Sequence, residues 1–403
     1  MVTETAKAPV APAGVRYLRT FVLVVAAATL VVASINLAAF TVMTRPENAA
    51  IVQLLDGWGR LYKPILYDAA GPEVVVFGAS YALDAFDPEV AGTIVGMRFF
   101  NFAVSGGQAY ENRRFAQSAS GNPALKAVIV PLDSFVVRPG APKVHYGFDE
   151  SILNRTPDGA PNPTVWVSRV LAMALSGAAV GNNIQLLQVL AQRAFGSAKE
   201  ELLASYQRRD NTLQADMLAD ARARVFPDLP PPAPEPLALP DGPAASGLPE
   251  LDATVDIFCD RDVDLYVYLT PRTRGSCFQP VETRLNAFAY LKARQEACRA
   301  RLHFFDFQYP NALTLEGVAS DVPLSAYYRP DGHPRPTVGE AMASAMFGKP
   351  FPDWVPDAVR ADFGIDLMSH PDPLSWWQRR LARCDGYWVG EDAAIVTDRA
   401  IVR

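Results

Sequence analysis

The hydrophobic pattern of the chain begins with a long apolar run near the amino end. Residues Phe21 to Met43 read FVLVVAAATLVVASINLAAFTVM, without a charged side chain. As a helix this run would be ~35 Å long, against a bilayer hydrocarbon core of ~30 Å. A cleavable signal peptide has an apolar region of only about 7–15 residues, although Ser34 and its neighbouring alanines leave cleavage open as an alternative. No second run of similar length occurs, so we expect a single-pass transmembrane anchor over residues 21–43.

Basic residues flank this span unevenly. Lys7, Arg16 and Arg19 precede the apolar run, and Arg45 follows it. Because cytoplasmic flanks carry the excess of Lys and Arg, this bias favours a cytoplasmic tail over residues 1–20 and the rest of the chain outside the cytoplasm. Residues 44–71 are expected to form a linker helix that leads into the following domain.

Beyond the linker, short apolar runs rich in β-branched residues alternate with longer helical or irregular stretches. Near-continuous apolar runs are typical of a parallel sheet covered on both faces. The pattern therefore predicts an α/β domain with a flavodoxin-like, doubly wound parallel sheet. The expected strands are Val74–Phe77, Phe99–Val104, Ala127–Leu132, Val263–Leu269 and Leu302–Phe307. The expected helices include Tyr110–Ser118, Val281–Ala300 and Val338–Phe347.

We place this domain at residues 72–349, interrupted by an insertion over 136–251. The insertion is helix-like at Trp166–Arg193 and Lys199–Ala223, and continues as a Pro-rich loop over 227–243 that is neither helix nor central strand. A substrate lid and a bulky surface decoration are both compatible with it. Residues 350–403 form a Trp-bearing extension, expected either to pack on the domain or to bind a partner.

Composition narrows the classes of function. The net charge of -6 provides no basic footprint, which argues against a nucleic-acid partner. The four cysteines contain no C-x-x-C pair and the four histidines are scattered, so neither a metal nor another cofactor is implied. In an oxidising compartment Cys259 and Cys298 are the first pair to consider for a disulfide. Buried free thiols are the other interpretation of the cysteines.

Residues suited to acyl chemistry gather after the expected strands. In a doubly wound sheet function collects at the carboxyl ends of the strands. Serine, histidine and aspartate there would supply a nucleophile, its general base and the group that orients the base. The residues at these ends are Gly78-Ala79-Ser80, Ser105-Gly106-Gly107, Asp133, Thr270-Pro271-Arg272 and Asp331-Gly332-His333.

Three of these segments together resemble the SGNH (GDSL-like) hydrolase superfamily. VVVFGAS resembles the nucleophile turn, FNFAVSGG the glycine block and YYRPDGHPRPTVG the block that unites Asp and His. The resemblance implies a catalytic triad of Ser80, His333 and Asp331. It also implies an oxyanion hole built from the backbone N–H of Ser80 and of Gly106 or Gly107. The Asp-x-His spacing is closer to the membrane-anchored branch that includes alginate O-acetylation proteins. The similarity covers about residues 72–137 and 262–347.

One position departs from the family pattern. The family usually has an Asn after the third strand as a side-chain donor to the oxyanion, and Asp133 stands there instead. A carboxylate would repel an oxyanion unless protonated or turned away, and loss of one such donor costs ~10²–10³ in rate. Arg272 or Arg274, after the fourth strand, is a candidate for auxiliary positive charge.

Simpler interpretations of the same residues exist. Ser80 could be a helix N-cap, and His333 could be an exposed loop residue beside two prolines. His303, within an apolar strand, is expected to be a core histidine with satisfied hydrogen bonds. The order and placement of these residues favour the interpretation of Ser80 as a nucleophile over these simpler ones. The residues are Ser80, Gly107, Asp331 and His333.

Two hypotheses about function follow. The first is an esterase or O-acyltransferase on the periplasmic side of the bacterial inner membrane, acting through Ser80 on an acylated saccharide of the envelope or an exopolysaccharide. The second is a catalytically inactive component of an envelope protein complex that uses the same fold for binding.

Overall fold

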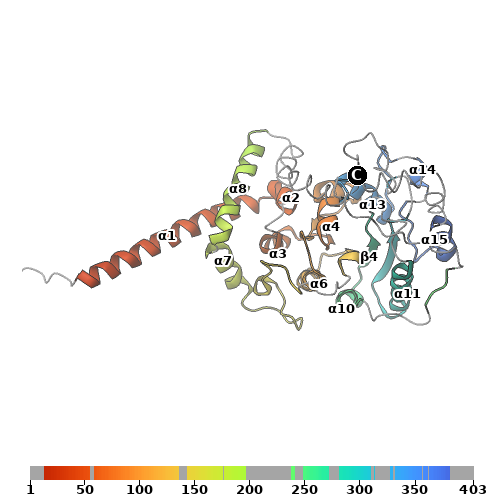
Figure 1. Cartoon of the computed structure of the whole chain (residues 1–403), viewed down its shortest axis with the longest axis horizontal. Coiled ribbons are helices and arrows are strands. Elements are labelled where there is room, and N and C mark those ends of the chain that lie inside the picture. Colours follow the sequence, from red (N-terminus) through yellow and green to blue (C-terminus); the bar gives the residue numbers. More distant parts are fainter. Residues whose placement is uncertain are drawn as a thin grey trace, which may run out of the picture.

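The structure, a computed structural model, joins one long helix to an α/β body (Figure 1). The residues that it describes are 13–54, 59–135, 143–175, 177–196, 237–240, 248–271, 281–309, 313, 327–329, 332–355, 357–361 and 363–381. Helix α1 (Ala13–Met43) projects from the body, and the remaining elements gather around a central sheet.

A single parallel sheet of five strands organises the body, in the order β2-β1-β3-β4-β5. The strands are β1 (Val74–Val76), β2 (Phe99–Asn101), β3 (Ala127–Pro131), β4 (Asp264–Leu269) and β5 (Arg301–Asp306). Each begins within two residues of a run selected from the sequence, so the predicted parallel α/β sheet is confirmed. Most of their side chains are buried, on both faces of the sheet, which explains why the runs are apolar without alternation.

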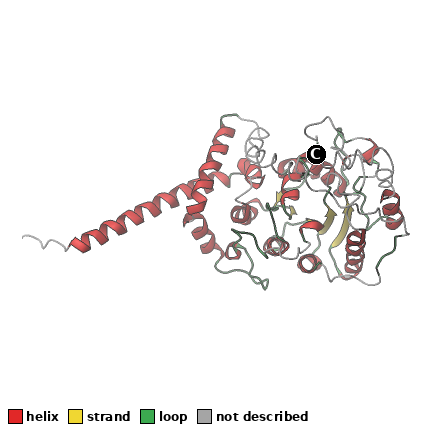
Figure 2. Cartoon of the chain, viewed as in Figure 1, coloured by secondary structure: helices red, strands yellow, loops and turns green. Residues whose placement is uncertain are grey.

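Helices cover both faces of this sheet (Figure 2). One apolar core contains Val75, Val128 and Val267, and the other contains Val74, Ile129 and Tyr268. Successive strand residues therefore enter opposite cores, as the pleat requires. The helices that follow α1 and precede the insertion are α2 (Pro46–Leu54), α3 (Gly59–Ala70), α4 (Ser80–Ala85), α5 (Pro88–Val95) and α6 (Ala109–Ala119). The short 3₁₀ turns η1 (Leu132–Ser134) and η2 (Glu150–Ile152) follow β3.

The insertion contributes two helices to the described part of the chain, α7 (Val165–Leu175) and α8 (Gly177–Ala194). Both lie, to within one residue at each end, in the helix-like stretch predicted over 166–193, and residue 176, between them, lies outside the described residues. Residues 237–240 carry no regular structure. The expected helix at 199–223 and the rest of the Pro-rich loop lie outside the described residues.

The later helices are α10 (Pro249–Cys259), α11 (Val281–Ala297), α13 (Pro336–Met346), α14 (Asp357–Arg360) and α15 (Pro373–Leu381). Trp376 and Trp377 of α15 are buried, and the indole N–H of Trp377 donates to Asp306 at 2.9 Å. The extension after residue 349 is thus packed on the domain as far as it is described, to residue 381.

Cys259, the last residue of α10, forms a disulfide with Cys298, which lies between α11 and β5. This confirms the predicted pair and rules out free thiols at these two positions. The backbone N–H groups of Arg299 and Ala300 also donate to the Cys259 carbonyl, at 2.8 and 3.0 Å. The disulfide therefore reinforces a backbone junction that holds α10 beside the start of β5. Cys277 and Cys384 lie outside the described residues.

Within the described residues, α1 is the one helix whose length and apolar composition suffice to cross a membrane. All its residues from Gly14 to Val31 are exposed, whereas Asn36, Ala39 and Met43 are buried. The carboxyl end of α1 thus packs against the body. The predicted linker contains two helices, α2 and α3, rather than one.

Candidate active site

Ser80 lies where β1 turns into α4, at the carboxyl edge of the sheet. The chain leaves β1 through Gly78, whose φ of 144° is a backbone conformation that favours glycine. A Cβ on Gly78 would lie 2.7 Å from Cγ of Pro131 and 2.8 Å from Cβ of Ala82. Conformation and crowding together explain why glycine stands two residues before Ser80.

Side chains from other elements hold this turn in place. The Gly78 N–H donates to Oδ1 of Asn112 on α6 at 3.2 Å, and the Ala79 N–H donates to Oγ of Ser134 at 3.1 Å. The Asn112 amide also donates to the Ser134 carbonyl at 3.3 Å. Asn112 is completely buried, so this network fixes the backbone ahead of Ser80 from within the core.

The hydroxyl of Ser80 lies 2.8 Å from Nε2 of His333, within hydrogen-bond distance. The N-cap of α4 is Ala79, and no side chain caps the helix, so the interpretation of Ser80 as an N-cap is wrong. The imidazole stacks on the ring of Tyr81, with centroids 4.1 Å apart and 13° between planes. A serine hydroxyl directed at a fixed imidazole is the arrangement that nucleophilic acyl chemistry requires.

His333 is held by a narrow backbone turn. The Arg329 N–H donates to the His333 carbonyl at 2.8 Å, and the Arg335 N–H donates to the Tyr327 carbonyl at 2.8 Å. Tyr328 and Pro334 form an antiparallel bridge between these bonds. We call the described residues 327–329 and 332–335 the histidine turn. His333 is therefore part of a hydrogen-bonded structure rather than a free surface loop.

Two contacts join the histidine turn and the helix after it, α13, to α4, the helix that begins with Ser80. Nη1 of Arg329 pairs with Oδ2 of Asp84 at 2.6 Å, with both side chains about 15 % exposed. Helix α13, which follows the turn, approaches α4 at Gly339, where a Cβ would lie 1.8 Å from the Ala85 carbonyl oxygen. Both contacts fix the distance between the nucleophile and the imidazole.

The predicted oxyanion glycines follow β2. Gly106 adopts a φ of 60°, and the N–H of Gly107 donates to the Val104 carbonyl at 3.0 Å. The Val104 N–H donates to the Gly78 carbonyl at 3.1 Å, which places this turn beside the one that carries Ser80. The Gly107 amide is thus engaged within its own turn, and an oxyanion hole at Ser80 and Gly106 or Gly107 stays a prediction.

Asp133 lies in η1, directly after β3. Its Oδ1 accepts a hydrogen bond from the Thr270 hydroxyl at the end of β4, at 2.9 Å. Burial raises the pKa of the Tyr268 hydroxyl well above its usual value, and the nearby Asp133 carboxylate raises it further. The Tyr268 hydroxyl therefore stays neutral beside the Asp133 carboxylate. Asp331 and Arg272, the other predicted site residues, lie outside the described residues.

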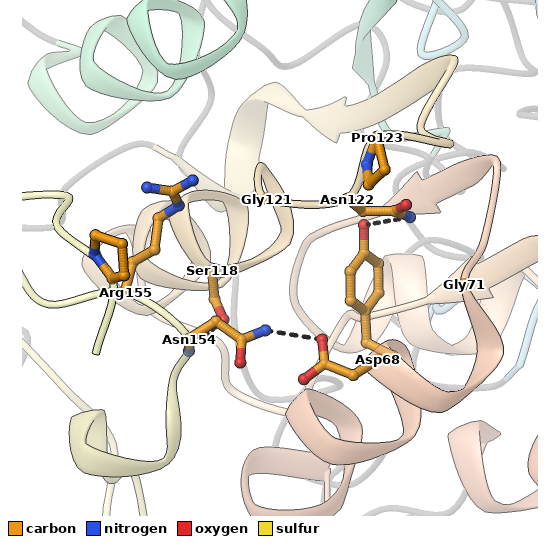
Figure 3. A pocket seen from close by; sticks show the side chains of 10 residues that line it. Asp68, Gly71, Ser118, Gly121, Asn122, Pro123, Asn154 and Arg155 are labelled. Atoms are coloured by element: carbon orange, nitrogen blue, oxygen red, sulfur yellow. Dashed lines mark hydrogen bonds between the residues drawn. The ribbon is translucent and has the colours of Figure 1, made fainter. Parts of the chain in front are cut away.

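A pocket on the opposite edge of the sheet is unrelated to this pair (Figure 3). It encloses about 390 Å³ and is lined by residues that precede β1 and β3, among them Asp68, Gly71 and Asn122. Its polar groups bond to one another, as when the Asn154 amide donates to Asp68 at 2.7 Å. Among the described residues, no group of three or more His, Cys, Asp and Glu side chains is placed to hold a metal ion.

Several residues of the site gave no sequence signal. Asn112, Ser134 and the Arg329–Asp84 pair act on partners between 34 and 245 positions away. Their residue types are common on helices and turns, so nothing local distinguishes them. Comparisons with protein-family models, curated proteins and solved structures gave no match.

Proposed function

We propose that this chain is an SGNH-type serine hydrolase, either an esterase or an O-acyltransferase, that acts on an acylated saccharide of the cell envelope. The observation that carries the proposal is the 2.8 Å approach of Ser80 Oγ to His333 Nε2 at the carboxyl edge of a parallel sheet. The strand order β2-β1-β3-β4-β5 supports it, because this is the flavodoxin-like order expected for that superfamily.

The site suggests a two-step reaction. His333 Nε2 takes the proton from Ser80 as Oγ attacks the acyl carbon, and the resulting imidazolium returns the proton to the departing alcohol oxygen. An acyl-serine ester remains. In the second step His333 deprotonates water or a sugar hydroxyl, whose oxygen attacks the acyl carbon, and the imidazolium returns the proton to Oγ of Ser80 as the acyl–serine bond breaks. Asp331, two residues before His333, is proposed to orient the imidazole.

The location is proposed to be the periplasmic face of the bacterial inner membrane, with α1 as the anchor. The disulfide between Cys259 and Cys298 supports an oxidising compartment, since structural disulfides are rare in the cytosol. The basic residues Arg16 and Arg19 before the apolar run support a cytoplasmic amino end.

Turnover of a small acetyl ester by the purified full-length chain tests the enzymatic proposal. Ser80→Ala and His333→Ala should each lower kcat by about 10⁴–10⁶-fold. Ser369→Ala makes the same serine change at an exposed position and should leave kcat unchanged. Turnover that survives in Ser80→Ala would contradict the proposal. A folded parent without turnover on any acyl ester would favour the second hypothesis, a catalytically inactive binding component of an envelope complex. The observation behind that hypothesis is the Asp133 carboxylate, which stands where the family has an oxyanion donor.

A further inference from the structure

Helix α7 exposes an apolar face. Trp166, Val167, Val170 and Leu171 are 72, 53, 37 and 52 % exposed. Positions i, i+1, i+4 and i+5 lie on one side of a helix, so these four side chains form a single stripe, which we call the α7 face. The helix has one charged residue, Arg169, which points to the other side and pairs with Asp68 at 2.6 Å.

Helices α7 and α8 lie across α1 where it enters the body (Figure 1). Buried amides make the junction: the Asn36 amide of α1 donates to the Ala174 carbonyl at 3.2 Å, and the Asn183 amide of α8 donates to Asn36 Oδ1 at 2.7 Å. The Tyr62 hydroxyl of α3 donates to Asn183 at 2.6 Å. These contacts fix the level of α7 and α8 along α1.

The length of α1 shows what lies at that level. A hydrocarbon core of ~30 Å takes about 20 helical residues. Counted from Thr20, just after Arg19, about 20 residues end at Ala39. Counted from Tyr17, just after Arg16, they end at Asn36. The exposed part of α1, from Gly14 to Val31, is only ~27 Å long and contains Arg16 and Arg19, so a full span that starts after either arginine reaches Asn36, which contacts both α7 and α8.

We propose that the α7 face is a membrane-docking surface, which lies in the interfacial layer of the same bilayer that α1 crosses. The inference rests on the membrane attachment in the proposed function, and it does not depend on catalysis. A tryptophan beside aliphatic side chains, with no charge among them, is the composition that favours this layer. Figure 1 shows α7 on the side of the body from which α1 projects.

Docking at two places gives the domain a defined orientation. A single helix would let the domain rotate and tilt about the anchor. The α7 face adds a second attachment at an angle to the first, and the buried Asn36–Asn183 bond couples the two. The insertion therefore acts as a membrane platform rather than as a lid in its described part.

Depth-dependent fluorescence quenching tests this proposal on the full-length chain in vesicles of phosphatidylethanolamine and phosphatidylglycerol. Cys277→Ser and Cys384→Ser leave only the disulfide cysteines in the background. An environment-sensitive fluorophore is then attached in Val167→Cys and separately in Leu171→Cys. Leu30→Cys, at an exposed position on α1, reports on the anchor, and Glu296→Cys on the distant helix α11 is the aqueous control.

Lipids with a doxyl group near the headgroup should quench the labels at 167 and 171 to an extent comparable with the anchor label, while 296 stays unquenched. Doxyl groups near the chain end should quench position 30 more strongly than 167 and 171. Quenching at 30 without quenching at either α7 position would overturn the docking surface, including the case in which another protein covers it. Loss of quenching at 30 as well would overturn the membrane attachment itself.

Discussion

The hydroxyl of Ser80 owes its orientation to residues far away in the sequence. Asn112 and Ser134 fix the backbone before it, and Nε2 of His333 lies 2.8 Å from its Oγ, within hydrogen-bond distance. Gly78 is the single local requirement, because no other residue fits beside Pro131 with a φ of 144°. At this scale the site is a set of tertiary contacts placed around one strained turn.

Arg329 is expected to be a positioning residue. Its ion pair with Asp84 joins the histidine turn to the helix of Ser80. Arg329→Met should lower kcat by up to about 10²-fold and leave KM nearly unchanged, because a misplacement of ~1 Å between reacting groups costs that much. Arg329→Lys should recover part of the rate. If the pair is the cause, Asp84→Asn should have the same effect and the double variant should be no slower. Multiplicative losses would contradict this role.

His303 predicts a pH-dependent contribution to stability. Burial acts to lower the pKa of its imidazole, but Asp366 at 2.8 Å and Asp264 at 3.2 Å outweigh burial and raise it above its usual value of 6.5. A raised folded-state pKa stabilises the fold fully below the unfolded pKa, and the contribution is lost as the pH rises through the folded value.

Urea unfolding of the parent and of His303→Gln at several pH values measures this contribution. The parent should be more stable by about 1–3 kcal/mol at pH values below the unfolded pKa, and the difference should shrink in alkaline buffer. A difference that grows with pH would contradict the raised pKa.

At the scale of elements, the sequence predicts the strands and helices better than it predicts the side-chain contacts that connect them. The strands and α6, α11 and α13 follow from local periodicity, and Ser80 and His333 follow from their place after strands. Helices α7 and α8 fall, to within one residue at each end, in the stretch that the same kind of periodicity predicts over 166–193. The Asn36–Asn183 bond joins residues 147 positions apart, so no local pattern indicates it.

Buried charge makes the packing of α11 on β5 sensitive to substitution. Nε of Arg284 lies 3.1 Å from Oδ2 of Asp306, with both side chains 1 % exposed, and Trp377 donates to the same carboxylate oxygen. Arg284→Met should lower the free energy of unfolding by about 3–5 kcal/mol, because it leaves a buried carboxylate without its cation. Lys126→Met breaks a solvent-exposed pair with Glu73 and should lower the free energy of unfolding far less, because water screens that pair. Thermal unfolding compares them, and equal losses would contradict the argument.

At the scale of the whole molecule, helix α1, the helices α7 and α8, and a parallel α/β domain are joined by buried contacts. Asn36, Asn183 and Tyr62 connect the first two to the third. The carboxyl edge of the sheet holds the Ser80–His333 pair, and the pocket of Figure 3 lies at the other edge. The proposed chemistry and the proposed membrane attachment therefore fall in separate parts of the molecule.

Covalent labelling with a fluorophosphonate probe, located by peptide mass spectrometry, tests most directly the claim that His333 activates Ser80. The probe should label the peptide that contains Ser80 in the full-length parent. It should label the same peptide in the Ser369→Ala variant. Labelling should vanish in Ser80→Ala and in His333→Ala, provided that circular dichroism shows both variants folded. A folded parent that takes no label, or a label that persists at the same rate in His333→Ala, would contradict the account.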